Sequence, residues 1–370
     1  MNTQNAEISD DYPLLKLMLN DSKQQSALYN PGPYWLKKSQ NAANEIRRCG
    51  LSDFRGSSSL IGLSYADNLF FDYRDALNSG VKKIFRFATK KLFPLNKIYD
   101  AQVQWTKSYA HQSLVLAREI LNNSHRVNTL LAKYSLPYSL TGGCLNFVEI
   151  DGKRLSIHYL NLLDQHDWVA EQVDFESATS VFEIGGGFGV NVHLLIENYK
   201  SIRKVLYLDI PPNLYVGTQY LKALFGKSVH DYSQTRGFEK ISFNENDQLE
   251  ILCIAPWQIE RITTAVDIFC NAHSFVEMPD NVVENYASRL MKLPNYNNTA
   301  IVLTTYDEFD LKTTIDPDRL PFFFSPRRFQ KSLHPTLINS FRKNIYLVST
   351  GKLAVESKTS PIVPTTTSTG

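Results

Sequence analysis

The spacing of hydrophobic residues changes about halfway along the chain. Up to about residue 150, apolar positions recur every three or four residues, as in 26–50 and 101–134, which is typical of amphipathic helices. From about residue 180, short apolar runs alternate with helical patterns, which is typical of a mostly parallel sheet with helices on both faces. The pattern therefore predicts a mainly helical N-terminal cap, 1–150, followed by an α/β domain of Rossmann-like type, 151–356.

The α/β region is expected to contain a run of buried strands and a last strand at the far side of the sheet. The expected strands are 180–184, 204–209, 249–254, 265–271, 299–305 and, last, 344–350. The helices between them are expected to begin near Gly189, Pro212, Trp257 and Asp280. The low-complexity end, 357–370, is expected to be a disordered tail.

Composition places the chain among ordinary soluble globular proteins. Of its residues, 43% are hydrophobic and 21% are charged, and the net charge of +2 argues against nucleic acid as a partner. The four cysteines lie far apart and form no zinc-binding pair. The N-terminus lacks the pattern of a signal peptide, and no apolar run approaches the ~20 residues needed to span a bilayer. These features predict a cytoplasmic protein.

One basic amphipathic stretch, 81–98, has two interpretations. It can dock on anionic lipid or on a polyanionic substrate, which would place the protein peripherally at the inner face of the membrane. A helix with a solvated charged face is the favoured interpretation for a chain of this net charge.

The most distinctive motif is "VFEIGGGFG", residues 181–189, where a strand meets a glycine-rich turn. The dinucleotide fingerprint G-x-G-x-x-G does not fit, because its last position falls on Val190 or Asn191. The form that fits is E-x-G-x-G-x-G, with Glu183, Gly185, Gly187 and Gly189.

A bare glycine turn before a helix favours a bound ligand. Glycine permits positive φ and lets a ligand touch the backbone, while the helix N-terminus offers free N–H donors. The next strand, "KVLYLDIPP", ends in Asp209, twenty residues after Gly189. An acid at this position of such a fold accepts hydrogen bonds from both ribose hydroxyls. Loop and acid together predict a nucleoside cofactor.

With these motifs the chain resembles the class I S-adenosylmethionine-dependent methyltransferases. The resemblance implies S-adenosylmethionine as the cofactor, bound at the ends of the first four strands. The end of the third strand would cover the adenine, although Trp257 has the alternative of packing on the helix that follows. The cofactor-binding residues implied are Glu183, Gly185, Gly186, Gly187, Phe188, Gly189, Asp209, Ile210, Pro256, Trp257 and Asn271.

Within that class the chain is similar to a bacterial family of sugar O-methyltransferases associated with surface-polysaccharide and capsule loci. The similar stretches span most of residues 30–310 and are 33–56, 181–189, 207–221, 255–260 and 271–280. The similarity implies methyl transfer to a sugar hydroxyl, with the N-terminal region as a helical cap over the acceptor.

Methyl transfer from a sulfonium requires a positioned acceptor and a base for its proton. His273, after the fourth strand, is the first candidate for the general base, and Glu277 is expected either to orient it or to bind sugar hydroxyls. Four residues of separation would put both on one face of a helical turn. The alternatives are a histidine satisfied by backbone groups and an acid favoured by a helix N-terminus.

Further candidates lie around this position. Ser274, Tyr306, Asp307 and His158 are the candidates for substrate binding, and structural roles are the alternative for each. The acidic loop 307–310 offers carboxylates suited to Mg²⁺, but a solvated loop is the favoured interpretation, so no metal is predicted.

Other functions stay open. One alternative is an NAD(P)-dependent sugar oxidoreductase or epimerase, another a methyltransferase acting on a non-sugar small molecule, and a third a catalytically silent interaction module. The acceptor can be a nucleotide sugar, a lipid-linked glycan or a small natural product. The aromatic-rich N-terminal region leaves a homodimer open beside a monomer.

Overall fold

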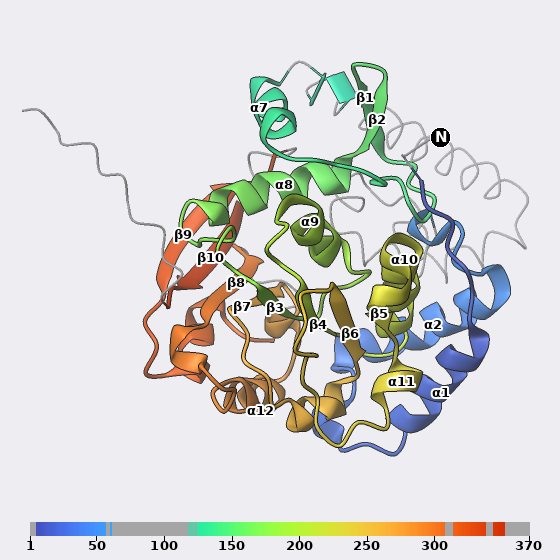
Figure 1. The fold of residues 1–370 in the computed structure, drawn as a ribbon, viewed down its shortest axis with the longest axis vertical. Helices are drawn as coiled ribbons and strands as arrows, with labels where there is room; N and C mark the ends of the chain where they lie inside the picture. The colour runs from blue at the N-terminus through green and yellow to red at the C-terminus, as the bar shows by residue number, and fades with distance from the viewer. Residues whose placement is uncertain are drawn as a thin grey trace, which may run out of the picture.

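The computed structural model describes residues 5–56, 60, 118–119, 121–122, 124–307, 314–337 and 343–351. An eight-stranded sheet with the order β5-β6-β4-β3-β7-β8-β10-β9 forms its centre (Figure 1). The strands are β3 (Ser180–Ile184), β4 (Lys204–Leu208), β5 (Val229–His230), β6 (Glu250–Ile254), β7 (Ile268–Ala272), β8 (Ala300–Tyr306), β9 (Gln330–Pro335) and β10 (Lys343–Ser349).

The direction of the strands defines the fold. Strands β5, β6, β4, β3, β7 and β8 are parallel, whereas β10 runs antiparallel to both of its neighbours, β8 and β9. The chain runs outward from β3 to β4 and β6 and then returns to the other side of β3 with β7. A parallel sheet with this reversal and an antiparallel β10 is the class I methyltransferase fold, and the predicted fold class is confirmed.

All six expected strands are present, because each is an apolar run long enough to be buried on both faces. Strands β5 and β9 were not predicted. Three of the four predicted helix starts are also correct, while the chain near Trp257 forms a short 3₁₀ helix.

Helices cover both faces of the sheet (Figure 1). α8 (Ile157–Ala170), α9 (Val190–Asn198) and α10 (Asn213–Phe225) pack on one face, and α12 (Asp280–Leu290) packs on the other. The short helices of this part are η4 (Gly226–Ser228), α11 (Tyr232–Thr235), η5 (Pro256–Arg261), η6 (Phe275–Glu277), η7 (Tyr296–Asn298) and η8 (Pro317–Phe324).

The described N-terminal residues are mostly helical. They form α1 (Tyr12–Ser22), η1 (Ala27–Tyr29), α2 (Pro33–Cys49), η2 (Phe54–Gly56), α7 (His125–Lys133) and an unpredicted hairpin of β1 (Phe147–Ile150) and β2 (Lys153–Ser156). Leu15, Met18 and Ile46 belong to the same buried cluster as the central strands. The boundary at residue 150 stays a prediction, and residues 81–98 and the tail 357–370 lie outside the described residues.

Gly217 is a point of close approach between α10 and the sheet. A Cβ at this position would overlap the phenol of Tyr207, whose hydroxyl donates to the carbonyl of Gly187 at 2.7 Å. In an open helix, Gly→Ala stabilises by up to about 1 kcal/mol. Here we expect Gly217→Ala to lower the free energy of unfolding by about 1–3 kcal/mol through overpacking, measured by thermal or urea unfolding.

The matched control is Gly237→Ala, because nothing lies within 4 Å of the Cβ that it would add. Equal unfolding midpoints for the two variants would contradict the close approach of α10 to β4.

Candidate active site

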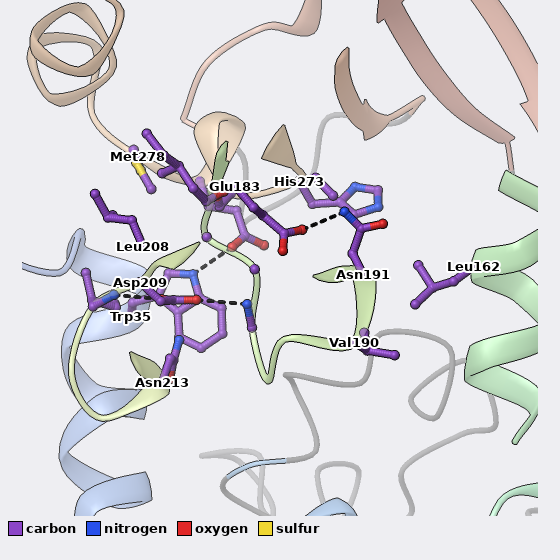
Figure 2. A pocket seen from close by; sticks show the side chains of 18 of the residues that line it. Trp35, Leu162, Glu183, Val190, Asn191, Leu208, Asp209, Asn213, His273 and Met278 are labelled. Atoms are coloured by element: carbon purple, nitrogen blue, oxygen red, sulfur yellow. Dashed lines mark hydrogen bonds between the residues drawn. The ribbon is translucent and has the colours of Figure 1, made fainter. Parts of the chain in front are cut away.

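A pocket opens at the carboxyl ends of β3, β4, β7 and β8, where the strand order reverses (Figure 2). This is the position at which open α/β sheets bind their ligands. The predicted site residues that line it are Glu183, Gly185, Gly186, Gly187, Asp209, Ile210, His158, His273, Ser274, Glu277 and Tyr306.

The glycine turn after β3 has backbone angles that other residues rarely adopt. Gly185 and Gly187 have φ values of 73° and 63°, within the left-handed region. A Cβ on Gly185 would also collide with the side chain of Ser274, and one on Gly186 with the carboxylate of Glu183. The turn therefore leaves bare backbone facing the pocket.

Asp209 ties the glycine turn to the end of β4. Its Oδ2 accepts from the backbone N–H of Gly187 at 2.8 Å, and its Oδ1 accepts from that of Ile210 at 2.7 Å. Burial raises the pKa of the Asp209 carboxyl to about 7, although these two N–H donors act to lower it. Figure 2 shows both hydrogen bonds beside the pocket.

Glu183, at the end of β3, is a second buried acid. Its Oε1 accepts from Nδ2 of Asn191 at 2.9 Å. Its Oε2 is buried and has no hydrogen-bond partner among the described residues. Burial raises the pKa of Glu183 to about 7, against the effect of the Asn191 amide. A buried acceptor left open in this way is suited to a ligand that brings a donor or a positive charge.

Asn271 connects two strand ends by hydrogen bonds, and its contact with the cofactor stays a prediction. Its Nδ2 donates to the carbonyl of Ile184 at 2.8 Å and to Oγ of Ser274 at 2.6 Å, and its Oδ1 accepts from the N–H of Phe275 at 3.1 Å. The side chain joins the end of β7 to the end of β3. Ser274 lines the pocket, whereas Asn271 does not.

His273 lies at the turn that follows β7. Its φ is 65°, which is uncommon for a residue with a side chain, and its N–H donates to the carbonyl of Thr304 at 2.7 Å. The imidazole stacks on the ring of Tyr306, with 4.3 Å between centroids and 21° between planes. The turn and the stacking together hold the imidazole at the pocket wall.

Glu277 connects two parts of the pocket. Its Oε1 accepts from the hydroxyl of Tyr306 at 3.1 Å and its Oε2 accepts from Nε1 of Trp35 at 2.7 Å. The helical turn expected to pair His273 with Glu277 is absent, because Glu277 lies in the 3₁₀ helix η6 while His273 adopts a left-handed backbone. Trp35, from α2, was not predicted as a site residue.

A wall of polar residues from α8 was only partly predicted. His158, Asn161 and Gln165 are buried and line the pocket on one face of this helix. Oδ1 of Asn161 is buried without a partner among the described residues. Burial, with Arg55 nearby, lowers the pKa of His158 well below its ordinary value, so the ring is neutral. Polar residues at helical spacing in the apolar "LSIHYLNLLDQHDW" were the available signal.

Two residues of the glycine motif belong to the core and do not line the pocket. Phe188 is 0% exposed and packs edge-on against Phe54 and Tyr220. Gly189 is the N-cap of α9 with φ 85°, close to Leu221. Contact of these two residues with the cofactor therefore stays a prediction, and their positions do not support it.

Three other predicted residues also lie away from the pocket. Nε1 of Trp257 donates to the hydroxyl of Tyr232 at 3.2 Å, so its indole packs on α11, and Pro256 begins η5. Asp307 is exposed and accepts from the N–H of Lys343 at 3.3 Å. None of the three residues lines the pocket, so the predicted adenine stacking and substrate contact stay predictions that this geometry does not support.

The charges that line the pocket are acidic. Glu183, Asp209 and Glu277 all line it, and among the residues that the structure describes no lysine or arginine does so. The charge of Glu277 contributes to the raised pKa of Asp209, and that of Asp209 to the raised pKa of Glu183. The pocket therefore favours a ligand that carries positive charge.

Within the described residues, no group of three or more His, Cys, Asp or Glu side chains is arranged to hold a metal. Glu308 and Asp310 of the acidic loop lie outside these residues. No described helix is long and apolar enough to cross a membrane.

Comparison with known proteins gave structural similarities only. No family model and no curated protein matches the sequence. The mitomycin 7-O-methyltransferase MmcR is 15% identical to this chain. The match covers 50% of this chain and 52% of MmcR, with a TM-score of 0.35. Human N-acetylserotonin methyltransferase in complex with SAM is 14% identical (52% and 55% covered, TM-score 0.32). A SAM-dependent methyltransferase from Aquifex aeolicus is 13% identical (52% and 94%, TM-score 0.34). This chain thus spans about half the length of the first two enzymes.

Proposed function

We propose that this protein is an S-adenosylmethionine-dependent methyltransferase. The observation that carries the proposal is the convergence of Glu183, Asp209 and Glu277 on one pocket without a lysine or arginine among its described lining residues. S-adenosylmethionine carries a sulfonium and an ammonium group, which such a pocket attracts. A nicotinamide dinucleotide carries a pyrophosphate, which is disfavoured by a pocket lined by acids and by no described lysine or arginine.

The residues present suit this cofactor. Asp209 offers a carboxylate for ribose hydroxyls at the end of β4, and the open Oε2 of Glu183 lies on the other side of the bare glycine turn. Gly185 and Gly186 leave space that any Cβ would fill. When bound, the cofactor supplies an activated methyl group, so the protein's own task is to place the acceptor and manage one proton.

We propose that His273 is the general base for the proton of the acceptor. The imidazole lines the pocket and is held by the stacked ring of Tyr306. Glu277 in turn accepts the hydroxyl hydrogen of Tyr306, which fixes the ring under His273. In this arrangement His273 accepts the proton of the acceptor hydroxyl, and Glu277 acts as a positioning residue.

The acceptor that we propose is a sugar hydroxyl, as in the synthesis of surface glycans. The support is the resemblance over residues 30–310, together with the polar wall of α8. Asn161 presents there a buried oxygen that has no partner in the described part of the chain, with Gln165 and His158 on the same face. Amide groups of this kind hydrogen-bond to hydroxyls. An acceptor analogue without the hydroxyl that pairs with Asn161 would leave this amide unpaired, at a cost of about 1–3 kcal/mol in binding free energy.

The proposal is tested by calorimetric titration of the full chain with S-adenosylhomocysteine and, separately, with NAD⁺. We expect saturable binding of S-adenosylhomocysteine and none of NAD⁺, since NAD⁺ would bring a pyrophosphate into a pocket with acidic lining residues and no described lysine or arginine. Binding of NAD⁺ alone would refute the assignment and favour an oxidoreductase.

A further inference from the structure

The N-terminal segment is fastened to the carboxyl edge of the sheet by contacts between residues far apart in sequence. The hydroxyl of Tyr29 donates to Oε1 of Glu260 at 2.5 Å, and that of Tyr232 donates to Oδ2 of Asp21 at 2.8 Å. The N–H of Asp11 donates to the hydroxyl of Tyr215 at 2.8 Å. In Figure 1 the blue helix α1 accordingly lies beside α10 and α11.

Trp35 is the residue of this segment that reaches the pocket. Its indole lines the same pocket as Asp209, Ile210 and Asn213, and it projects from the blue ribbon of α2 in Figure 2. Its Nε1 donates to Oε2 of Glu277 at 2.7 Å. The backbone is close here as well, because a Cβ on Gly32 would lie 3.3 Å from the carbonyl oxygen of Glu277.

Two facts give Trp35 a role in binding. The aromatic group expected to cover the nucleoside, Trp257, faces α11, and Trp35 is the indole that lines the pocket within the described part of the chain. Its N–H also stabilises the carboxylate of Glu277, one of the three acids that line the pocket, by a hydrogen bond. The same side chain is therefore both a wall of the pocket and a link to the acceptor side through Glu277 and Tyr306.

We propose that Trp35 is a cofactor-contacting residue, so that the N-terminal helix α2 forms one wall of the S-adenosylmethionine pocket. This inference rests on the proposed function. It makes the N-terminal segment part of the cofactor site, in addition to the predicted role as a cap over the acceptor.

The test uses tryptophan fluorescence of the full chain during titration with S-adenosylhomocysteine, with calorimetry in parallel. The variants are Trp35→Phe, which keeps a ring but loses the N–H, Trp35→Ala, which removes the ring, and Trp257→Phe as the matched control. Unfolding midpoints of all three are measured first, and Trp35→Phe decides the question if Trp35→Ala does not fold.

We expect ligand to change the fluorescence of the wild type and of Trp257→Phe, and most of that change to disappear in Trp35→Phe. Trp35→Ala should weaken binding about tenfold, because an aromatic wall is lost. A wild-type protein that does not bind S-adenosylhomocysteine refutes the proposed function. Two outcomes in a wild type that binds would overturn the role of Trp35 and leave the proposed function intact. One is a Trp35→Phe variant with the same fluorescence response as the wild type, and the other is a wild type without any fluorescence response.

Discussion

Replacing Asp209 by alanine is expected to abolish measurable binding of S-adenosylhomocysteine, with a loss of at least about 100-fold in affinity. Two effects combine. The ribose loses its carboxylate acceptor, and the N–H groups of Gly187 and Ile210 lose the partner that fixes the glycine turn. Each hydrogen bond to a charged group contributes about 1.5–3 kcal/mol, so the loss of two or more weakens binding by at least about 100-fold.

Calorimetry on the variant measures this effect, with Asp307→Ala as the control because that acid is exposed and outside the pocket. Asp307→Ala should bind like the wild type. Affinity that survives in Asp209→Ala would mean that the nucleoside does not bind at the end of β4.

The second large effect expected is that of pH on the affinity for the cofactor. Burial raises the pKa of both Glu183 and Asp209 to about 7, so the empty pocket holds protons at neutral pH. A cationic cofactor favours the charged carboxylates, so binding lowers both pKa values and releases protons. Affinity for S-adenosylmethionine should therefore rise with pH, by up to about tenfold per carboxyl between about pH 6 and pH 8.

Titrations in two buffers of different ionisation enthalpy measure the released protons directly. Glu183→Gln keeps an oxygen for the Nδ2 of Asn191 and removes one titrating group, so the slope of affinity against pH should become shallower. A Glu183→Gln variant with the same slope and the same proton release as the wild type would contradict the assignment to this carboxyl.

The sheet was largely predictable because its strands are continuous apolar runs. β3, β4, β6, β7 and β8 are buried almost throughout. β9, "QKSLHP", is polar, half-exposed and ends in proline, so it forms only because β10 pairs with it. β5 has two residues, too few for any sequence pattern.

The site was predictable where local spacing determines the chemistry. Glu183, the glycine turn and Asp209 follow from strand ends and turn geometry alone. Trp35 was not predictable, because its place in the pocket depends on packing with Glu277, which is far away in sequence. The environment of Trp257 was left open between the adenine and a neighbouring helix, because a pattern locates the end of a strand but not the direction in which the next side chain turns.

The link between Trp35 and Glu277 has a consequence for how the protein matures. The two residues are 242 positions apart, so one wall of the pocket is synthesised long before the other. Contacts over such a separation form late in folding, because a long loop must close first. Under the proposed function, the cofactor would bind molecules in which this contact has formed and would not bind incompletely folded ones. At 100 times its dissociation constant it would add about 2.7 kcal/mol to the stability of the completed fold.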